Sequence, residues 1–345
     1  MRKILVTGGT GYIGSHTVVE LQKSGFEPVI IDNLSNSNAK IVDLIARITG
    51  RKPLFEKLDM CDLPALQSFF EKHDDIAGVI HFAAYKAVGE SVNNPLKYYR
   101  NNIVSLLNLL QCMEMLQHKN LVFSSSCTVY GQPDNLPVTE LAPVKPAISP
   151  YGNTKQIAEE IIRDTVSQQD IMAISLRYFN PIGAHESGLI GELPLGVPDN
   201  LVPYITQTAI GKREKLTVFG NDYDTHDGTC IRDYIYVSDL AKAHVVALNR
   251  MLDEKNEQSH EIFNVGTGTG YSVLDAINSF EKTTGVNLNW AFSDRRPGDV
   301  EQVWADTTLA NLKLGWKAEK DLDVMMATAW KWEQTLATGI MEAGG

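Results

Sequence analysis

Cysteine is scarce in this chain of 345 residues, which contains only Cys61, Cys112, Cys127 and Cys230. The four are widely spaced, form no CxxC pair, and have no histidines at ligand spacing beside them. A disulfide framework or a structural zinc site is therefore not expected. His185 and His226 stand in stretches without ligand-spaced partners, so no metal is expected there either.

Positive charge and long apolar runs are also lacking. The chain has 31 Lys and Arg against 42 Asp and Glu, and this net charge of −11 repels nucleic acid and anionic lipid. After Met1 to Lys3 only three apolar residues precede Thr7, far short of a signal peptide, and no run reaches transmembrane length. We expect a cytoplasmic protein that binds neither nucleic acid nor membrane.

What is present is an ordinary globular composition, with 43% hydrophobic and 21% charged residues, and a length sufficient for about two domains. Short β-branched runs alternate with segments of helical spacing, which predicts βαβ units and a parallel sheet. Several runs are almost continuously apolar, as strands covered on both faces should be. The runs are Lys3–Thr7, Pro28–Ile31, Gly78–Ala83, Leu121–Ser125, Ala173–Tyr178 and Glu261–Val265. The predicted fold is α/β, a doubly wound parallel sheet (Rossmann) with a smaller α/β substrate domain.

Glycine and proline crowd residues 181–200 and break every periodicity there. We therefore predict a first domain over 1–180, with returns near 233–268, and a discontinuous second domain over 181–232 and 269–345. The segment Leu96–Leu116 carries more apolar positions than one helix face can hold. It is expected to bury two faces, either inside a large core or with one face on a second subunit, as in a homodimer.

The first candidate site is a glycine turn between a predicted strand and a predicted helix. Gly8, Gly11 and Gly14 fit GxxGxxG, and Gly9 also completes GxGxxG. Asp32 ends the next strand, at about the spacing of the dinucleotide fingerprint. Such glycines let a pyrophosphate approach the backbone at the helix N-terminus. The Asp32 carboxylate would repel a 2′-phosphate, which favours NAD over NADP.

The second candidate site is Tyr151 with Lys155, four residues apart and thus on one helix face. A nearby cation favours phenolate, so Lys155 is expected to lower the pKa of Tyr151 toward neutrality, where it can act as a general base. Ser124 to Ser126 follow a strand at its carboxyl end, where ligands bind in open α/β sheets. A hydroxyl there can share a substrate proton with Tyr151.

Taken together, these motifs resemble the extended short-chain dehydrogenase/reductase family over essentially the whole chain, and within it the nucleotide-sugar epimerases. The resemblance is carried by Gly8/Gly11/Gly14, Asp32-Asn33, His81–Ser91, Ser124–Ser126, Tyr151 with Lys155, and Arg177–Pro181. It implies that Tyr151 is the acid/base, that Lys155 holds the nicotinamide ribose, and that Ser126 bridges to the sugar 4-oxygen.

The resemblance also implies the ligand contacts. NAD would be held by Gly8, Gly11, Tyr12, Ile13, Gly14, Asp32, Asn33, Leu34, Ser35, Asn36, Ser37, Asp59, Met60, Phe82, Ala83, Ala84, Lys86, Asn101, Ser126, Tyr151 and Lys155. A UDP-hexose would meet Phe179, Asn180, Asn200, Thr217, Val218, Phe219, Arg232, Arg296 and Asp299. Two arginines suit a diphosphate because each guanidinium gives permanently charged, bidentate contacts.

The activity implied is reversible 4-epimerisation of UDP-glucose and UDP-galactose through a transient 4-keto sugar and bound NADH. Val303 stands where enzymes restricted to unmodified sugars often have a tyrosine, so N-acetylated sugars are expected to be accepted as well. The alternatives are a UDP-glucuronate epimerase and a non-catalytic NAD-sensing regulator. A 4,6-dehydratase is disfavoured because Cys127 and Thr128 replace its usual acidic pair.

Overall fold

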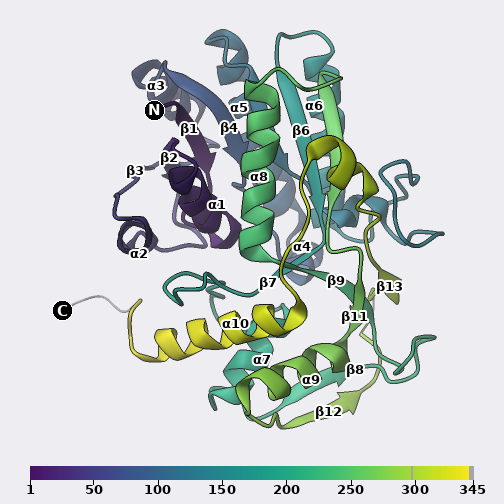
Figure 1. The fold of residues 1–345 in the computed structure, drawn as a ribbon. Helices are drawn as coiled ribbons and strands as arrows, with labels where there is room; N and C mark the ends of the chain where they lie inside the picture. Colours follow the sequence, from purple (N-terminus) through teal and green to yellow (C-terminus); the bar gives the residue numbers. More distant parts are fainter. Residues whose placement is uncertain (297, 342–345) are drawn as a thin grey trace.

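A seven-stranded parallel sheet forms the upper part of the molecule (Figure 1). The computed structural model describes residues 1–296 and 298–341. The strand order is β10-β6-β5-β4-β1-β2-β3, so the chain winds outward from β1 in both directions. The strands are β1 (Lys3–Thr7), β2 (Glu27–Asp32), β3 (Leu54–Lys57), β4 (Ile76–His81), β5 (Asn120–Ser124), β6 (Met172–Tyr178) and β10 (His260–Val265).

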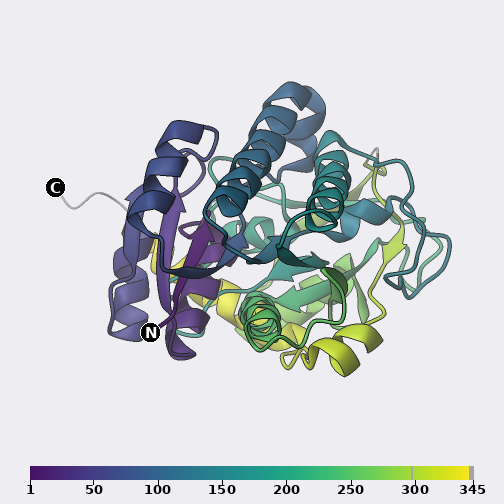
Figure 2. The same ribbon diagram turned by 90° about the horizontal axis from the view of Figure 1, so that it is seen from above.

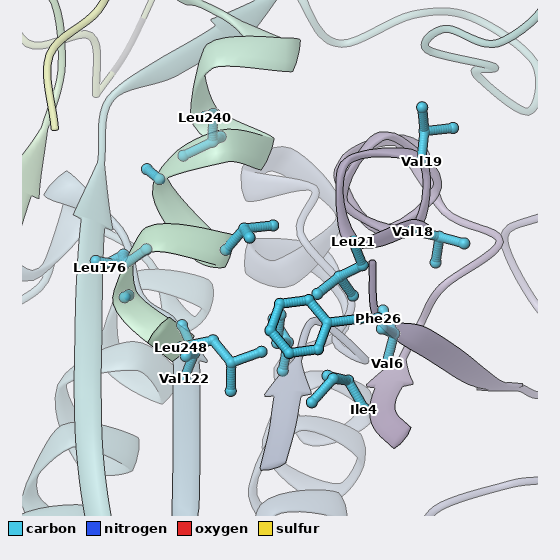
Figure 3. Close-up of a cluster of buried hydrophobic side chains, with 14 of the residues drawn as sticks. Ile4, Val6, Val18, Val19, Leu21, Phe26, Val122, Leu176, Leu240 and Leu248 are labelled. Carbon is cyan, nitrogen blue, oxygen red and sulfur yellow. The ribbon is translucent and has the colours of Figure 1, made fainter. Parts of the chain in front are cut away.

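Helices cover both faces of this sheet, as Figure 2 shows from above. One face carries α1 (Tyr12–Lys23), α2 (Lys40–Thr49) and α8 (Val237–Leu252), and the other carries α3 (Leu63–Lys72), α5 (Pro95–Met115) and α6 (Pro150–Val166). Each face has its own hydrophobic cluster. In the first, Leu21 from α1 and Leu248 from α8 meet strand residues such as Val122 (Figure 3).

Local sequence signals determine where two of these helices begin. The Asp62 carboxylate accepts the Ala65 N–H at the start of α3, and the Ser149 hydroxyl accepts the Gly152 N–H at the start of α6. Both helices have proline in the first turn, where its missing N–H costs nothing. The cap at Ser149 marks the start of α6, the helix that carries Tyr151 and Lys155.

A smaller region lies below the carboxyl edge of the sheet (Figure 1). Its four-stranded sheet contains β7 (Asn180–Ile182), β9 (Ile231–Tyr236), β11 (Gly270–Ser272) and β13 (Gln302–Val303). A second pair joins β8 (Leu216–Phe219) to β12 (Trp290–Ser293). The helices are α7 (Leu201–Ala209), α9 (Val273–Thr284) and α10 (Leu322–Ala337). Short elements elsewhere are α4 (Val88–Asn93), the 3₁₀ turn η1 (Cys127–Tyr130) and the π turn η2 (Ala310–Leu314).

The predicted doubly wound sheet is confirmed, and all six predicted strands occur in it. Strand β4, predicted over Gly78–Ala83, runs from Ile76 to His81, two residues earlier, because the chain leaves the sheet where Thr7 accepts the N–H groups of Phe82 and Ala83. The edge strand β3 was not predicted, since its residues are half exposed and lack an apolar run. Residues 310–316, expected in the second region, pack into the cluster between α8 and the sheet.

Within residues 1–296 and 298–341, no helix combines the length and the apolar character needed to cross a membrane.

The cluster in Figure 3 gives a stability prediction. Leu248 is fully buried, so Leu248→Ala leaves a cavity and should lower the free energy of unfolding by about 2–5 kcal/mol. Leu312, 78% exposed in η2, is the matched control, and its alanine variant should stay within about 0.5 kcal/mol of wild type. Denaturant unfolding measures both. Equal losses in the two variants would contradict this packing.

Candidate active site

The glycine turn between β1 and α1 is shaped for close contact with a ligand. Gly8 has φ +68°, and a Cβ on it would lie 2.9 Å from the Ala83 nitrogen. A Cβ on Gly14 would lie 2.3 Å from the Gly8 oxygen, so both positions require glycine. Among the described residues, the N–H groups of Tyr12 and Ile13 donate to no acceptor. Free N–H groups at a helix N-terminus fit a pyrophosphate.

The Asp32 carboxylate lies at the carboxyl end of β2 and organises the loop after it. It accepts the Leu34 N–H at 2.9 Å, the Thr10 N–H at 3.2 Å and the Ser37 hydroxyl at 2.9 Å. Leu34 is thereby held in the left-handed region, with φ 60°. Residues 33–37, all among the NAD contacts that the resemblance implies, therefore form a loop beside the glycine turn.

Further predicted cofactor residues follow the neighbouring strands. Asp59 and Met60 come after β3, but the Met60 side chain is buried in the core. Phe82, Ala83, Ala84 and Lys86 follow β4. Asn101 lies on α5 and donates to the Asn102 side chain at 3.0 Å. Asn102, which sequence reasoning missed, also bonds to the Tyr85 backbone and the Thr154 hydroxyl.

Tyr151, Lys155 and Ser126 come together at the end of β5. The Lys155 ammonium lies 6.0 Å from the Tyr151 ring centroid and donates to the Ser124 carbonyl at 2.6 Å. Ser126 lies beside the Tyr151 phenol, and its hydroxyl accepts the Thr128 N–H at 3.2 Å. All three side chains are buried. The acid/base candidate, its cation and a bridging hydroxyl thus share one enclosed corner.

Burial controls the charges in this corner. It raises the pKa of Tyr151 well above its usual value, against the lowering effect of the Ser126 hydrogen bond. It lowers the pKa of Lys155 to about 8, while the Glu159 carboxylate raises it. The expectation that Lys155 lowers the pKa of Tyr151 toward neutrality is therefore wrong, because desolvation outweighs the attraction of an ammonium at this distance.

The lower wall of the site holds the predicted nucleotide-sugar residues. Phe179 and Asn180 follow β6, and Asn200 precedes α7. Arg296 donates to Asp299 at 2.7 Å, and Arg232 lies 4.0 Å from the same carboxylate. The Asp299 carboxylate therefore lies beside both guanidiniums. The last predicted contacts lie on β8: Thr217 is partly exposed and Phe219 is exposed beside Arg296, whereas Val218 is buried in the core of the lower region.

One histidine differs from its prediction. His226 was predicted to lack ligand-spaced partners, yet it lies 3.6 Å from Asp227 and 3.3 Å from Asp275. The three offer donor atoms within 4.8 Å of one another. Asp227 already accepts from Thr229 and Ser272, and Asp275 accepts the Ser272 N–H. These bonds explain the cluster as the anchor of the α9 N-terminus, which a sequence pattern cannot show because Asp275 is 49 positions away from His226.

Comparisons with known proteins identify the family. A family model described as GDP-mannose 4,6 dehydratase matches residues 5–329. A UDP-glucose 4-epimerase from Bacillus subtilis is 50% identical over 99% of each chain, and one from Homo sapiens is 49% identical over 98% of each.

The crystal structure of UDP-glucose-4-epimerase from Stenotrophomonas maltophila with bound NAD and formylated UDP-arabinopyranose has TM-score 0.95 and 47% identity, covering 98% of this chain and 100% of that one. One from Bifidobacterium longum in complex with NAD+ and UDP has TM-score 0.92 and 43% identity, covering 98% of this chain and 99% of that one. This chain belongs to the UDP-glucose 4-epimerase family. The resemblance to the extended short-chain dehydrogenase/reductases is confirmed.

Sequence reasoning missed one further side chain of this UDP-glucose 4-epimerase family member, Glu192. Glu192 accepts from Lys86 at 2.8 Å and from Asn200 at 2.7 Å. Its carboxylate thereby joins a predicted cofactor residue to a predicted substrate residue across the site. No sequence signal marks Glu192, because it stands alone in the glycine- and proline-rich stretch and its Lys86 partner is 106 positions away.

The raised pKa of Tyr151 predicts that its phenol stays protonated in nucleotide-free protein over the whole range of about pH 6–9. Ultraviolet titration of wild type and Tyr151→Phe should therefore give superimposable phenolate signals in that range. A phenolate that appears near neutral pH in wild type and is missing from Tyr151→Phe would contradict the burial argument.

Proposed function

We propose that this protein is an NAD-dependent isomerase that interconverts UDP-glucose and UDP-galactose by epimerisation at C4. The observation that carries the proposal is the buried group of Tyr151, Lys155 and Ser126 at the carboxyl edge of the sheet. The glycine turn lies at the same edge of the sheet, and Arg232 and Arg296 lie beside Asp299 in the lower region. The relatives support it, since UDP-glucose 4-epimerases of similar sequence and fold are crystallised with NAD.

Different residues of this chain bind the cofactor, bind the diphosphate and transfer the proton. The turn at Gly8 and Gly14 and the Asp32 loop hold the cofactor, whereas Arg232 and Arg296 neutralise the diphosphate. Ser126 orients the sugar 4-hydroxyl, and Tyr151 takes its proton and later returns it. NAD, when bound, supplies the hydride acceptor and donor for C4 and a positive ring that favours loss of the phenol proton. A firmly held diphosphate and a loosely held sugar let the 4-keto sugar turn and present its other face.

Elimination of water, the dehydratase reaction, is disfavoured by the residues after Ser126. Cys127 and Thr128 stand where a dehydratase needs an acidic pair, and burial raises the pKa of the Cys127 thiol to about 12. Neither side chain can transfer a proton as a carboxyl group does at neutral pH. A non-catalytic regulator is disfavoured because Tyr151, Lys155 and Ser126 are all present, and nothing in the site favours a glucuronate over a neutral hexose.

The direct test is conversion of UDP-galactose to UDP-glucose by purified protein without added NAD. Activity is expected because each cycle regenerates the cofactor. Tyr151→Phe should slow it by about a hundredfold or more, since the general base is lost. Tyr204→Phe on α7, whose ring packs against Arg213 instead, should remain active. Full activity in Tyr151→Phe would rule out the assigned base.

We also propose that N-acetylated UDP-hexoses are substrates. Val303 is buried beside Phe179 in a small cluster that also includes Cys127, so it lies against the sugar end of the site. Its side chain is small, and Val303→Tyr should abolish epimerisation of UDP-N-acetylglucosamine while sparing UDP-galactose. Wild-type protein that turns over UDP-galactose without detectable N-acetyl activity would contradict this.

A homodimer in the cytoplasm is the proposed form of the enzyme. Leu96 and Leu107 are exposed on α5, and Ile103 and Ile161 are partly exposed on α5 and the neighbouring α6. Such an apolar strip across two helices suits a second copy. Light scattering should give a dimer for wild type and a monomer for Leu107→Glu. A wild-type monomer would contradict the proposal. The four cysteines are free, as expected for a reducing compartment.

We propose the predicted domain division as well, with residues 1–180 and returns near 233–268 for NAD, and 181–232 with 269–345 for the nucleotide sugar. The four-stranded sheet and the β8–β12 pair support it. Residues 310–316 depart from it, since they pack beside α8 and β10.

A further inference from the structure

A buried ion pair lies directly behind the catalytic corner and is not used by the mechanism above. Arg177 on β6 donates to both carboxylate oxygens of Glu159 on α6, with Nη2 to Oε2 at 2.5 Å and Nε to Oε1 at 2.9 Å. Their side chains are only 5% and 8% exposed. A buried charge pair costs desolvation energy that hydrophobic residues would not, so it is weak evidence for stability alone. A role in the site is the better explanation.

The pair is tied to the loop that carries Ser126. The hydroxyl of Ser125 donates to Glu159 Oε1 at 2.5 Å, and Ser125 is fully buried. On the other side, Arg177 Nη1 donates to the Tyr130 hydroxyl at 3.0 Å, and Tyr130 donates to Asn264 Oδ1 at 2.6 Å. The ion pair is thus hydrogen-bonded to both ends of the segment from Ser125 to Tyr130. Ser126, within this segment, lies beside Tyr151.

Glu159 also faces Lys155, one helical turn earlier on α6. The other groups around the ammonium are Tyr151 on the same helix, His81 on β4, and the Phe123 ring and Ser124 carbonyl on β5. Burial lowers the pKa of His81 to about 3, so His81 is neutral. Glu159 is therefore the anion that favours the charged form of Lys155.

We propose that Glu159 is a positioning residue of the epimerase: through Ser125 it fixes the Ser126 hydroxyl toward Tyr151, and it places a carboxylate one helical turn from Lys155 on α6. The inference rests on the proposed function. Its two parts separate experimentally, because Ser125 carries the positional link and the carboxylate carries the electrostatic one.

Three variants test it, with UDP-galactose as substrate. Ser125→Ala removes the positional link but keeps the ion pair, and should lower kcat about tenfold with little change in KM and in the pH profile. Glu159→Gln removes the anion. Because Lys155 then loses its proton at lower pH, the alkaline limb of the kcat profile should move toward acid.

Glu261→Gln is the matched control. Glu261 forms a similarly buried bidentate pair with Arg250, at 2.7 and 2.8 Å, near the amino end of β10 and away from the site. It should lose stability and keep the wild-type kcat and pH profile. Thermal unfolding of every variant shows whether it folds, and Ser125→Ala tests the positional link even if Glu159→Gln does not fold.

Wild-type kcat in folded Ser125→Ala, or a wild-type pH profile in folded Glu159→Gln, would overturn the corresponding part of the proposal. An equal kcat loss in Glu261→Gln would also overturn it, since the effect would then reflect stability alone. If wild type itself fails to convert UDP-galactose, the proposed function fails instead, so the two failures are distinguishable.

Discussion

The burial of Tyr151 and Lys155 in one corner is the constraint on which the rest of the site depends. Burial disfavours charge on both groups, raising the pKa of the phenol and lowering that of the ammonium to about 8. The chain supplies the compensating anion, Glu159, from the same helix, and the bridging hydroxyl, Ser126, from the adjacent strand end. Burial therefore favours the neutral phenol.

The parallel sheet makes this arrangement possible. Because β1, β4, β5 and β6 are neighbours and point the same way, their carboxyl ends place the glycine turn, Phe82, Ser126 and Phe179 along one edge. The lower region then closes that edge with Arg232, Arg296 and Asp299. Two arginines gathered by one carboxylate provide local positive charge in a chain whose net charge is −11. The acidic composition argues against polymeric nucleic acid without excluding a single nucleotide.

Features that depend on neighbouring residues could be predicted from the sequence, and those that depend on distant partners could not. The turn at Gly8 to Gly14 and the pair Tyr151–Lys155 are local spacings. Glu159 meets Arg177 across 18 positions and Glu192 meets Lys86 across 106, so no pattern marks either pair. The direction of the Tyr151 pKa shift was mispredicted for the same reason, because the burial that dominates it comes from the whole fold.

The central claim is that the hydrogen on C4 of the sugar leaves and returns within this one enclosed site. The most direct measurement is conversion of UDP-galactose carrying deuterium at C4 in ordinary water, with the label in the UDP-glucose product followed by mass spectrometry and NMR. We expect the deuterium to be retained at C4. Loss of the label to solvent would contradict it, because the hydrogen would then have left as an exchangeable proton.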